Sequence, residues 1–164
     1  KLKHVHLVES RKQGRRVIYS LAGQPALRLW LTLRDMGMAA LPDVREEMRT
    51  HASESALLPD LAGDDLLERV RRGDVELVDL RPSDEYEAGR IPRARSIPLD
   101  ELEDKLDELP DDKTIVAYCR GPYCVAAIRG VRRLREHGFD ARRFRDGIAE
   151  WKAEQLPLET EQDS

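Results

Sequence analysis

A chain of 164 residues can form one domain of ordinary size, or a domain of about 100 residues beside a smaller unit. With 40% hydrophobic and 37% charged residues and a formal net charge of -4, the composition excludes collagen-like and wholly disordered chains. No apolar run approaches the roughly 20 residues of a membrane-spanning helix, and no signal peptide is evident. The sequence therefore predicts a cytoplasmic protein with no membrane partner.

Positive charge is concentrated in the first 50 residues. They contain ten Lys or Arg against five Asp or Glu, whereas the remaining residues contain 18 basic and 27 acidic side chains. A polyanion would be attracted to this end of the chain and repelled by the rest.

The beginning of this basic part predicts a β-hairpin. Residues 1–21 contain two short β-prone stretches, the second around Val17 and Tyr19, on either side of the charged run 11–16. Gly14 lies within that run, where a hairpin needs a tight turn.

A long helix is predicted to follow the hairpin. Apolar residues recur at helical spacing over 24–50, and Pro25 suits the first turn. Pro42 should kink or split this helix, because proline lacks the N–H of a helix interior. Residues 51–62 are rich in Ser, Pro, Asp and Gly, which is typical of a linker.

From residue 63 onward, helix-forming and strand-forming stretches alternate, which is typical of a parallel α/β sheet. Strands are predicted at 75–80, 97, 114–118 and 141–144. Helices are predicted at 64–72, 83–88, 99–109 and 124–137, with a last helix after Gly147. We therefore expect an α/β domain over 63–159, with helices flanking a parallel sheet, and a tail at 160–164.

The most informative stretch is AYCRGPYCVAA, residues 117–127, in which an apolar strand ends at Cys119 before a short loop and a helix. Ligands bind beyond the carboxyl ends of parallel strands, so this thiol should lie at the functional edge. Loop N–H groups and the helix N-terminus should favour its thiolate, the nucleophilic form. Gly121 lets the loop curl around the sulfur, and Arg120 adds positive charge. We predict Cys119 as the catalytic residue.

Residues 63–159 resemble the rhodanese family in a series of motifs that occur in the family's order. The matching residues are Asp79, Arg81, Glu85 and Tyr86 in a D-x-R segment, Gly89, Ile91, Pro92 and Ala94 in a G-H-I-P-x-A segment, and Gly147, Trp151, Leu156 and Pro157 near the end. The resemblance implies a rhodanese-like sheet and sulfurtransferase activity. Cys119 would take sulfane sulfur from thiosulfate or a persulfide or polysulfide donor, hold it as a persulfide, and pass it to a thiol acceptor.

The active-site loop departs from the family's C-R-S-G-x-R pattern. It consists of Arg120, Gly121, Pro122, Tyr123, Cys124 and Val125, so a cysteine replaces the second basic residue. Cys124 could act as a resolving thiol that attacks the persulfide and leaves a Cys119–Cys124 disulfide, or it could pack as a small apolar side chain. Asp79, Arg81 and Glu85 are interpreted as a structural ion pair beneath the loop rather than as catalytic groups.

Two other chemistries are disfavoured by residue spacing. A cysteine phosphatase or arsenate reductase needs an arginine six positions after the nucleophile, where this chain has Val125. The two cysteines and four scattered histidines lack the spacing of zinc ligands. We therefore expect no metal ion and no cofactor.

Residues 7–21 resemble the last part of an ArsR-type winged-helix repressor, comprising the exit from the recognition helix and the basic wing. The resemblance implies phosphate contacts by Arg11, Lys12, Arg15 and Arg16. Residues 1–50 would then be the C-terminal part of a DNA-binding domain, with a homodimer formed through 24–50. Most of the recognition unit would precede Lys1, so DNA is expected as a partner of the full-length protein.

Two functions from different classes follow. In the first, the protein is an enzyme that transfers sulfur with Cys119. In the second, the same site is a redox or reactive-sulfur sensor, whose persulfide or disulfide alters DNA binding with little turnover. The presence of Cys119 argues against a third hypothesis, a catalytically silent scaffold.

Overall fold

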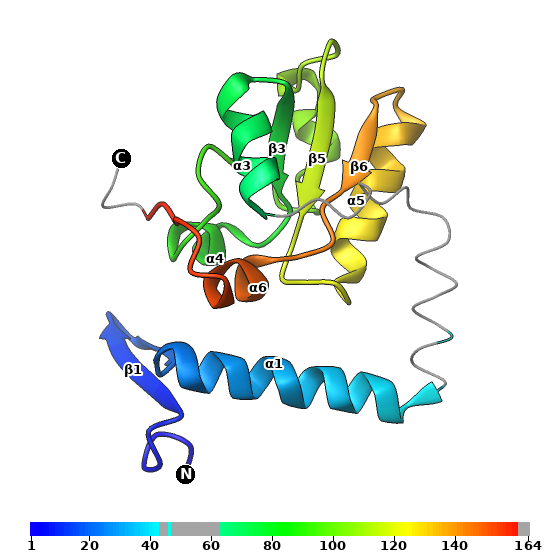
Figure 1. The fold of residues 1–164 in the computed structure, drawn as a ribbon. Helices are drawn as coiled ribbons and strands as arrows, with labels where there is room; N and C mark the ends of the chain where they lie inside the picture. The colour runs from blue at the N-terminus through cyan, green and yellow to red at the C-terminus, as the bar shows by residue number, and fades with distance from the viewer. Residues whose placement is uncertain (43–45, 47–62, 161–164) are drawn as a thin grey trace. The chain divides into compact units, whose positions relative to one another are not determined.

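The computed structural model describes residues 1–42, 46 and 63–160. The chain divides into two compact units, Lys1–Arg45 and Glu46–Ser164, which are described separately (Figure 1). The predicted linker, 51–62, lies outside the described residues, as does the predicted tail apart from Thr160.

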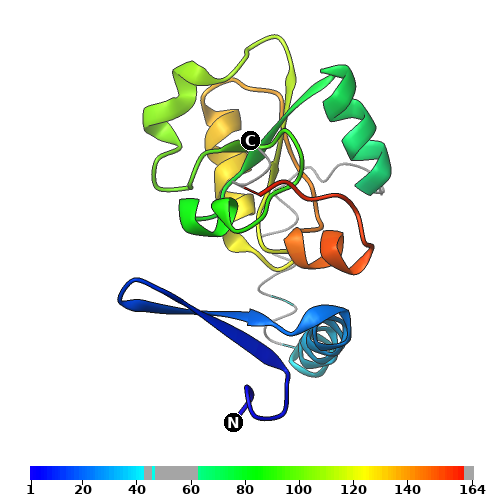
Figure 2. The same ribbon diagram turned by 90° about the vertical axis from the view of Figure 1, so that its left-hand side faces the viewer.

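The first unit contains a β-hairpin followed by a helix, as predicted (Figure 2). Strands β1 (Val8–Gln13) and β2 (Arg16–Leu21) pair antiparallel, from Val8↔Leu21 to Gln13↔Arg16. A two-residue loop joins them, and Gly14 adopts a φ of 59° at its first position. That backbone conformation is the one a type II′ hairpin turn requires of glycine.

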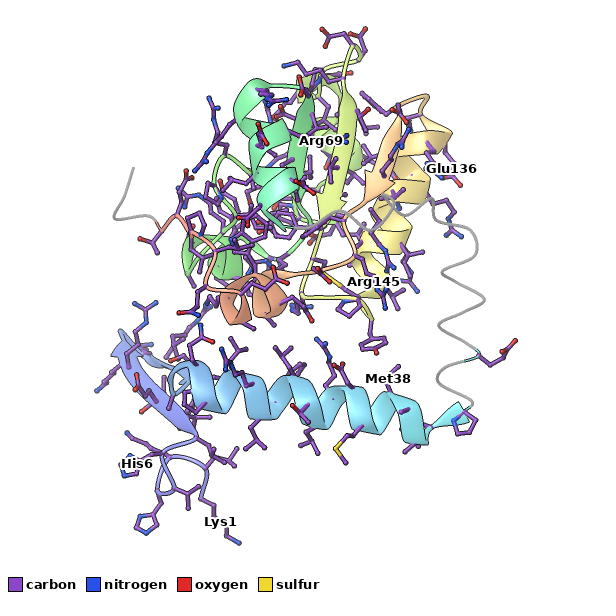
Figure 3. The ribbon with its side chains drawn as sticks, in the orientation of Figure 1. Lys1, His6, Met38, Arg69, Glu136 and Arg145 are labelled. Carbon is purple, nitrogen blue, oxygen red and sulfur yellow. A yellow bond between two sulfur atoms is a disulfide. The ribbon has the colours of Figure 1, made fainter. Side chains whose placement is uncertain are left out.

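Helix α1 (Gly23–Ala40) covers the first part of the helix predicted over 24–50, and Pro42 and Glu46 beyond it are again helical, so the predicted split near Pro42 is observed. Helix α1 ends before Leu41, whose backbone is not helical. Pro42 is the physical reason, because its ring disfavours the helical conformation of the preceding residue. Residues 43–45 and 47–50 lie outside the described part of the chain. Figure 3 shows the side chains that project from α1. Its exposed large apolar residues are Leu29, Trp30, Leu33 and Met36.

The second unit is built on a parallel four-stranded sheet in the order β4-β3-β5-β6. The strands are β3 (Val75–Asp79), β4 (Arg95–Ser96), β5 (Thr114–Tyr118) and β6 (Ala141–Arg143). The helices are α3 (Gly63–Arg72), α4 (Ser83–Glu87), α5 (Val125–Glu136) and α6 (Ile148–Ala153). The predicted α/β class with helices flanking a parallel sheet is confirmed.

Each face of the sheet carries its own hydrophobic core, because successive strand residues point to opposite faces. In β5, Val116 and Tyr118 pack with α3 and α6, whereas Ile115 and Ala117 pack against α5. Cys119 continues the α5 side of the core. The strand thus delivers this cysteine to the side of the sheet on which the following helix begins.

The segment predicted as an amphipathic helix over 99–109 instead forms a 3₁₀ helix, Glu103–Glu108. Residues 99–109 contain six acidic residues and one lysine, so like charges three and four positions apart disfavour a longer α-helix. Leu102 and Leu109 anchor its ends in the core. Nowhere in residues 1–42 and 63–160 does a helix have the length and apolar character needed to cross a membrane.

Candidate active site

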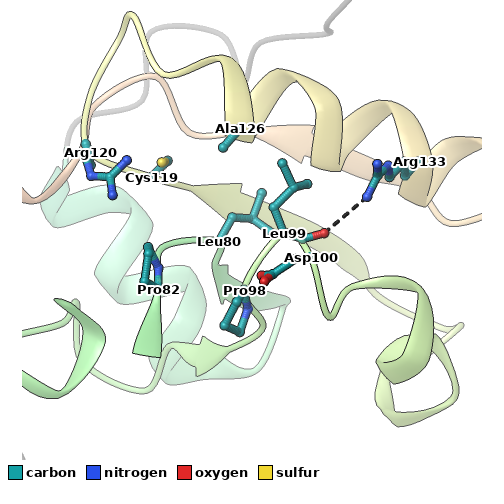
Figure 4. Close-up of a pocket in the computed structure, with 9 residues that line it drawn as sticks. All are labelled: Leu80, Pro82, Pro98, Leu99, Asp100, Cys119, Arg120, Ala126 and Arg133. Atoms are coloured by element: carbon teal, nitrogen blue, oxygen red, sulfur yellow. Dashed lines mark hydrogen bonds between the residues drawn. The ribbon is translucent and has the colours of Figure 1, made fainter. Parts of the chain in front are cut away.

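Cys119 follows β5 directly and lies at the wall of a pocket of about 330 Å³ (Figure 4). The residue is 2% exposed, and the pocket is where its surface is reached from outside. The lining is mainly apolar, with charged groups at its edges: Leu80, Pro82, Pro98, Leu99, Ala126, Asp100, Arg120 and Arg133. Arg133 is held at the far end by a 3.1 Å hydrogen bond to the Leu99 carbonyl (Figure 4).

The second cysteine closes the loop onto the first. Cys119 and Cys124 form a disulfide, with their Cα atoms 6.2 Å apart. The Cys124 N–H donates to the Gly121 carbonyl at 3.1 Å, which turns the chain within the loop. The distance between the two Cα atoms lies within the range over which a pair of cysteines can be bridged.

Cys124 also occupies the N-cap of α5. No side chain caps this 12-residue helix, and its first turn contains no acidic residue. The N–H groups of the first turn therefore present uncompensated positive potential near the cysteine loop. An anionic sulfur is the species that such a position stabilises.

Gly147 supports the loop from the other side. It lies where the chain enters α6, and its Cα faces the backbone of Cys119, Arg120 and Gly121. A Cβ at this position would overlap the Arg120 carbonyl carbon and the Gly121 nitrogen. The loop path therefore depends on a residue without a side chain.

The three residues predicted as one ion pair under the loop are divided between two pairs. Asp79 and Arg81 pair with each other in the interior, exposed by 0% and 4%, and Arg81 Nε donates to Asp79 Oδ1 at 2.9 Å. Burial lowers the pKa of Arg81, but the hydrogen bond and charge of Asp79 outweigh it, so the net pKa is raised. Arg81 also donates to the Gly89 carbonyl at 2.8 Å, which ties two loops together.

Glu85 instead pairs with Arg120 of the active-site loop. Arg120 Nε lies 3.0 Å from both Glu85 carboxylate oxygens, in a pair whose side chains are 58% and 36% exposed. The hydrogen bond that Arg120 donates to Glu85 raises the pKa of Arg120. This pair fixes one end of the loop to α4.

Arg143 is a further residue of the site that sequence reasoning missed. It lies at the end of β6, is 4% exposed, and donates from Nη1 to the Pro122 carbonyl at 3.1 Å. The sequence did contain a signal for it. Arg143 shares a face with the apolar Ala141 in a predicted strand, which places a charged side chain on the inward face.

The four basic residues proposed to contact DNA lie on the hairpin of the first unit. Arg11 and Lys12 are in β1, Arg15 is in the turn and Arg16 begins β2, and all four are exposed. Among residues 1–42, 46 and 63–160, no group of three or more His, Cys, Asp or Glu is placed to hold a metal ion.

The sequence and the fold were compared with those of known proteins. Residues 62–154 match the family described as Rhodanese-like domain. The HTH-type transcriptional regulator Rv0324 of Mycobacterium tuberculosis is 41% identical over 160 residues, which is 96% of this chain and 69% of that protein. A sulfurtransferase of Allochromatium vinosum is 31% identical over 86 residues, 52% of this chain and 78% of that protein. The structure of a rhodanese-related protein from Thermoplasma volcanium superimposes with a TM-score of 0.55 and 26% identity, covering 63% of this chain and 100% of that one.

Proposed function

Because the chain belongs to the rhodanese-like domain family over residues 62–154, we propose that it is a sulfur-transferring part of a transcriptional regulator. Cys119 carries sulfane sulfur as a persulfide. The observation that carries this proposal is the position of Cys119 at the end of β5, on a pocket and beside the N-terminus of α5. Similarity to an HTH-type regulator over 96% of this chain supports the regulatory context, and such a regulator would work in the cytoplasm.

The chemistry consists of two transfers. The Cys119 thiolate attacks the outer sulfur of thiosulfate, forming a Cys119 persulfide and releasing sulfite. An acceptor thiolate then attacks the outer sulfur of that persulfide, which regenerates the Cys119 thiolate and yields a persulfide on the acceptor. The apolar lining beside the thiol would desolvate a dianion, so it favours polysulfide or organic persulfide donors over thiosulfate.

The Cys119–Cys124 disulfide supports a second function, that of a sensor. The Cys124 thiolate attacks the inner sulfur of the Cys119 persulfide, forming the disulfide and releasing hydrosulfide. This reaction consumes the carried sulfur without an external acceptor. The resulting change would be transmitted to DNA binding, with Arg11, Lys12, Arg15 and Arg16 contacting phosphates in the full-length protein.

The two functions are separated by intact-protein mass spectrometry of the reduced chain after mixing with thiosulfate or with inorganic polysulfide. We expect Cys124→Ser to gain one sulfur atom and keep it, and Cys119→Ser to gain none from thiosulfate. Wild-type protein that loses two hydrogens and releases sulfide would favour the sensor. If Cys124→Ser gains no sulfur from either donor, the sulfurtransferase proposal is wrong.

We also propose that the chain forms a homodimer through the exposed apolar stripe of α1. Leu29, Leu33 and Met36 recur at helical spacing and are 55%, 66% and 65% exposed. Contiguous exposed apolar surface of this kind is typical of an interaction site.

An aspartate in the centre of this stripe should dissociate the dimer. We expect Leu33→Asp to sediment as a monomer in analytical ultracentrifugation, because a charge at an apolar interface loses its hydration. Asp35→Lys is the control, since Asp35 is exposed and lies about 100° or more around the helix from each residue of the stripe. Equal sedimentation of the two variants and the wild type would contradict the interface.

A further inference from the structure

Arg143 is a buried cation beside the cysteine loop, with 4% of its surface exposed. Its Nε is buried without a hydrogen-bond partner, and its Nη1 reaches only a neutral carbonyl, that of Pro122. No carboxylate among residues 1–42, 46 and 63–160 lies within ion-pair distance of it. The two other arginines that are buried among the described residues, Arg81 and Arg90, have carboxylate partners, Asp79 and Glu159. Burial, and then the charge of Arg145, lowers the pKa of Arg143, as expected of a cation without compensation.

The position of Arg143 connects it with the two cysteines. Arg143 pairs in register with Ala117, two residues before Cys119, and Phe144 donates to the Ala117 carbonyl at 2.9 Å. Its other contact, Pro122, lies between the cysteines in the loop. The segment from Arg143 to Gly147 therefore meets the loop at both of its ends, Arg143 at Pro122 and Gly147 at residues 119–121. The register with Ala117 places the Arg143 side chain on the α5 side of the sheet.

The charge of Arg143 is unmatched only while the sulfurs are neutral. A disulfide carries no charge, whereas reduction or sulfur loading produces a thiolate or persulfide anion at the same loop. An unpaired buried charge is unfavourable, and an anion nearby reverses that penalty. The uncapped N-terminus of α5 adds to the same positive potential, while Arg120 is already engaged by Glu85.

We propose that Arg143 is the counter-cation of the anionic sulfur at this site, a positioning residue that holds the loop through Pro122 and stabilises thiolate and persulfide relative to the disulfide. The inference rests on the proposed function, since it assigns a role around the Cys119 sulfur. Arg143 would then supply the positive charge that the rhodanese loop pattern places at the position of Cys124.

The experiment measures the alkylation rates of Cys119 and Cys124 by iodoacetamide in the reduced full chain as a function of pH, with peptide mass spectrometry as readout. Arg143→Gln removes the charge but keeps a donor for the Pro122 carbonyl, and Arg143→Lys keeps the charge. The control is Arg142→Gln, because Arg142 lies on the opposite face, is 43% exposed and is 3.7 Å from Asp140. The other charged or titratable groups around the loop stay unchanged in every variant: Glu85, Arg120, Tyr123, Arg129, Arg145 and Asp146.

We expect Arg143→Gln to raise the apparent pKa of the more reactive cysteine by about one unit, which lowers its alkylation rate at neutral pH about tenfold. Arg143→Lys should recover most of the rate, and Arg142→Gln should match the wild type. A wild-type profile in folded Arg143→Gln, or a lysine variant as slow as the glutamine variant, overturns the proposal. Circular dichroism checks that each variant folds. If Arg143→Gln does not fold, Arg143→Met replaces it as the variant without the charge, with the same expected result.

This measurement is independent of the proposed sulfur transfer. Alkylation requires no sulfur donor, so the effect of Arg143 persists even if Cys119 never forms a persulfide. Conversely, normal sulfur loading with an unchanged alkylation profile would overturn the role of Arg143 alone.

Discussion

We expect Gly147→Ala to abolish sulfur loading at Cys119. The added Cβ would lie 2.5 Å from the Cys119 carbonyl oxygen and would overlap backbone atoms of Arg120 and Gly121. Backbone atoms cannot rotate away as a side chain can, so the loop that presents the thiol must move. Overpacking of this kind costs about 1–3 kcal/mol of unfolding free energy, which leaves most domains folded. The measurement is sulfur uptake by mass spectrometry, together with urea denaturation.

Two other glycines provide matched controls for this substitution. Gly37→Ala adds a methyl group to α1 where no atom lies within 4 Å, so we expect unchanged loading and a gain of about 1 kcal/mol. Gly130→Ala meets the Leu80 side chain, which can shift, and we expect a partial loss of loading. Normal sulfur uptake by Gly147→Ala would show that the loop adapts to a bulkier neighbour.

Replacing Asp79 with alanine should cause the largest loss of stability in this domain. The substitution leaves the Arg81 guanidinium buried and unpaired, at 4% exposure. Breaking a buried ion pair by removing one partner costs about 3–5 kcal/mol of unfolding free energy, a large fraction of the stability of a typical domain. Urea denaturation, monitored by the fluorescence of buried Trp151, measures this loss. The exposed Trp30 is changed to Phe in all variants so that it does not contribute to the fluorescence.

A second pair of variants distinguishes the lost ion pair from a general packing defect. Asp79→Leu combined with Arg81→Met should recover much of the stability, because an apolar pair of similar volume carries no charge to desolvate. Glu85→Gln removes one partner of an exposed pair and should cost about 0–1 kcal/mol. Equal losses for Asp79→Ala and Glu85→Gln would mean that burial does not control the strength of these pairs.

The sequence by itself determined the features that depend on local pattern. The apolar run of β5, predicted at 114–118, ends at the same residues in the structure, and the glycine and proline signals located the hairpin turn and the break before Pro42. The cysteine at the strand end could be identified because side-chain periodicity and strand termination are properties of a few consecutive residues.

Only the tertiary structure decided which distant groups meet. Glu85 and Arg120 are 35 positions apart, and Arg143 reaches Pro122 across 21 positions, so neither contact leaves a periodic signal in the sequence. The spacing of Cys119 and Cys124 permits either a disulfide or separate packing, and only the structure shows the two residues joined in a disulfide. Contacts of this kind depend on the order of strands in the sheet and on loop closure, whereas sequence patterns report burial and local backbone geometry.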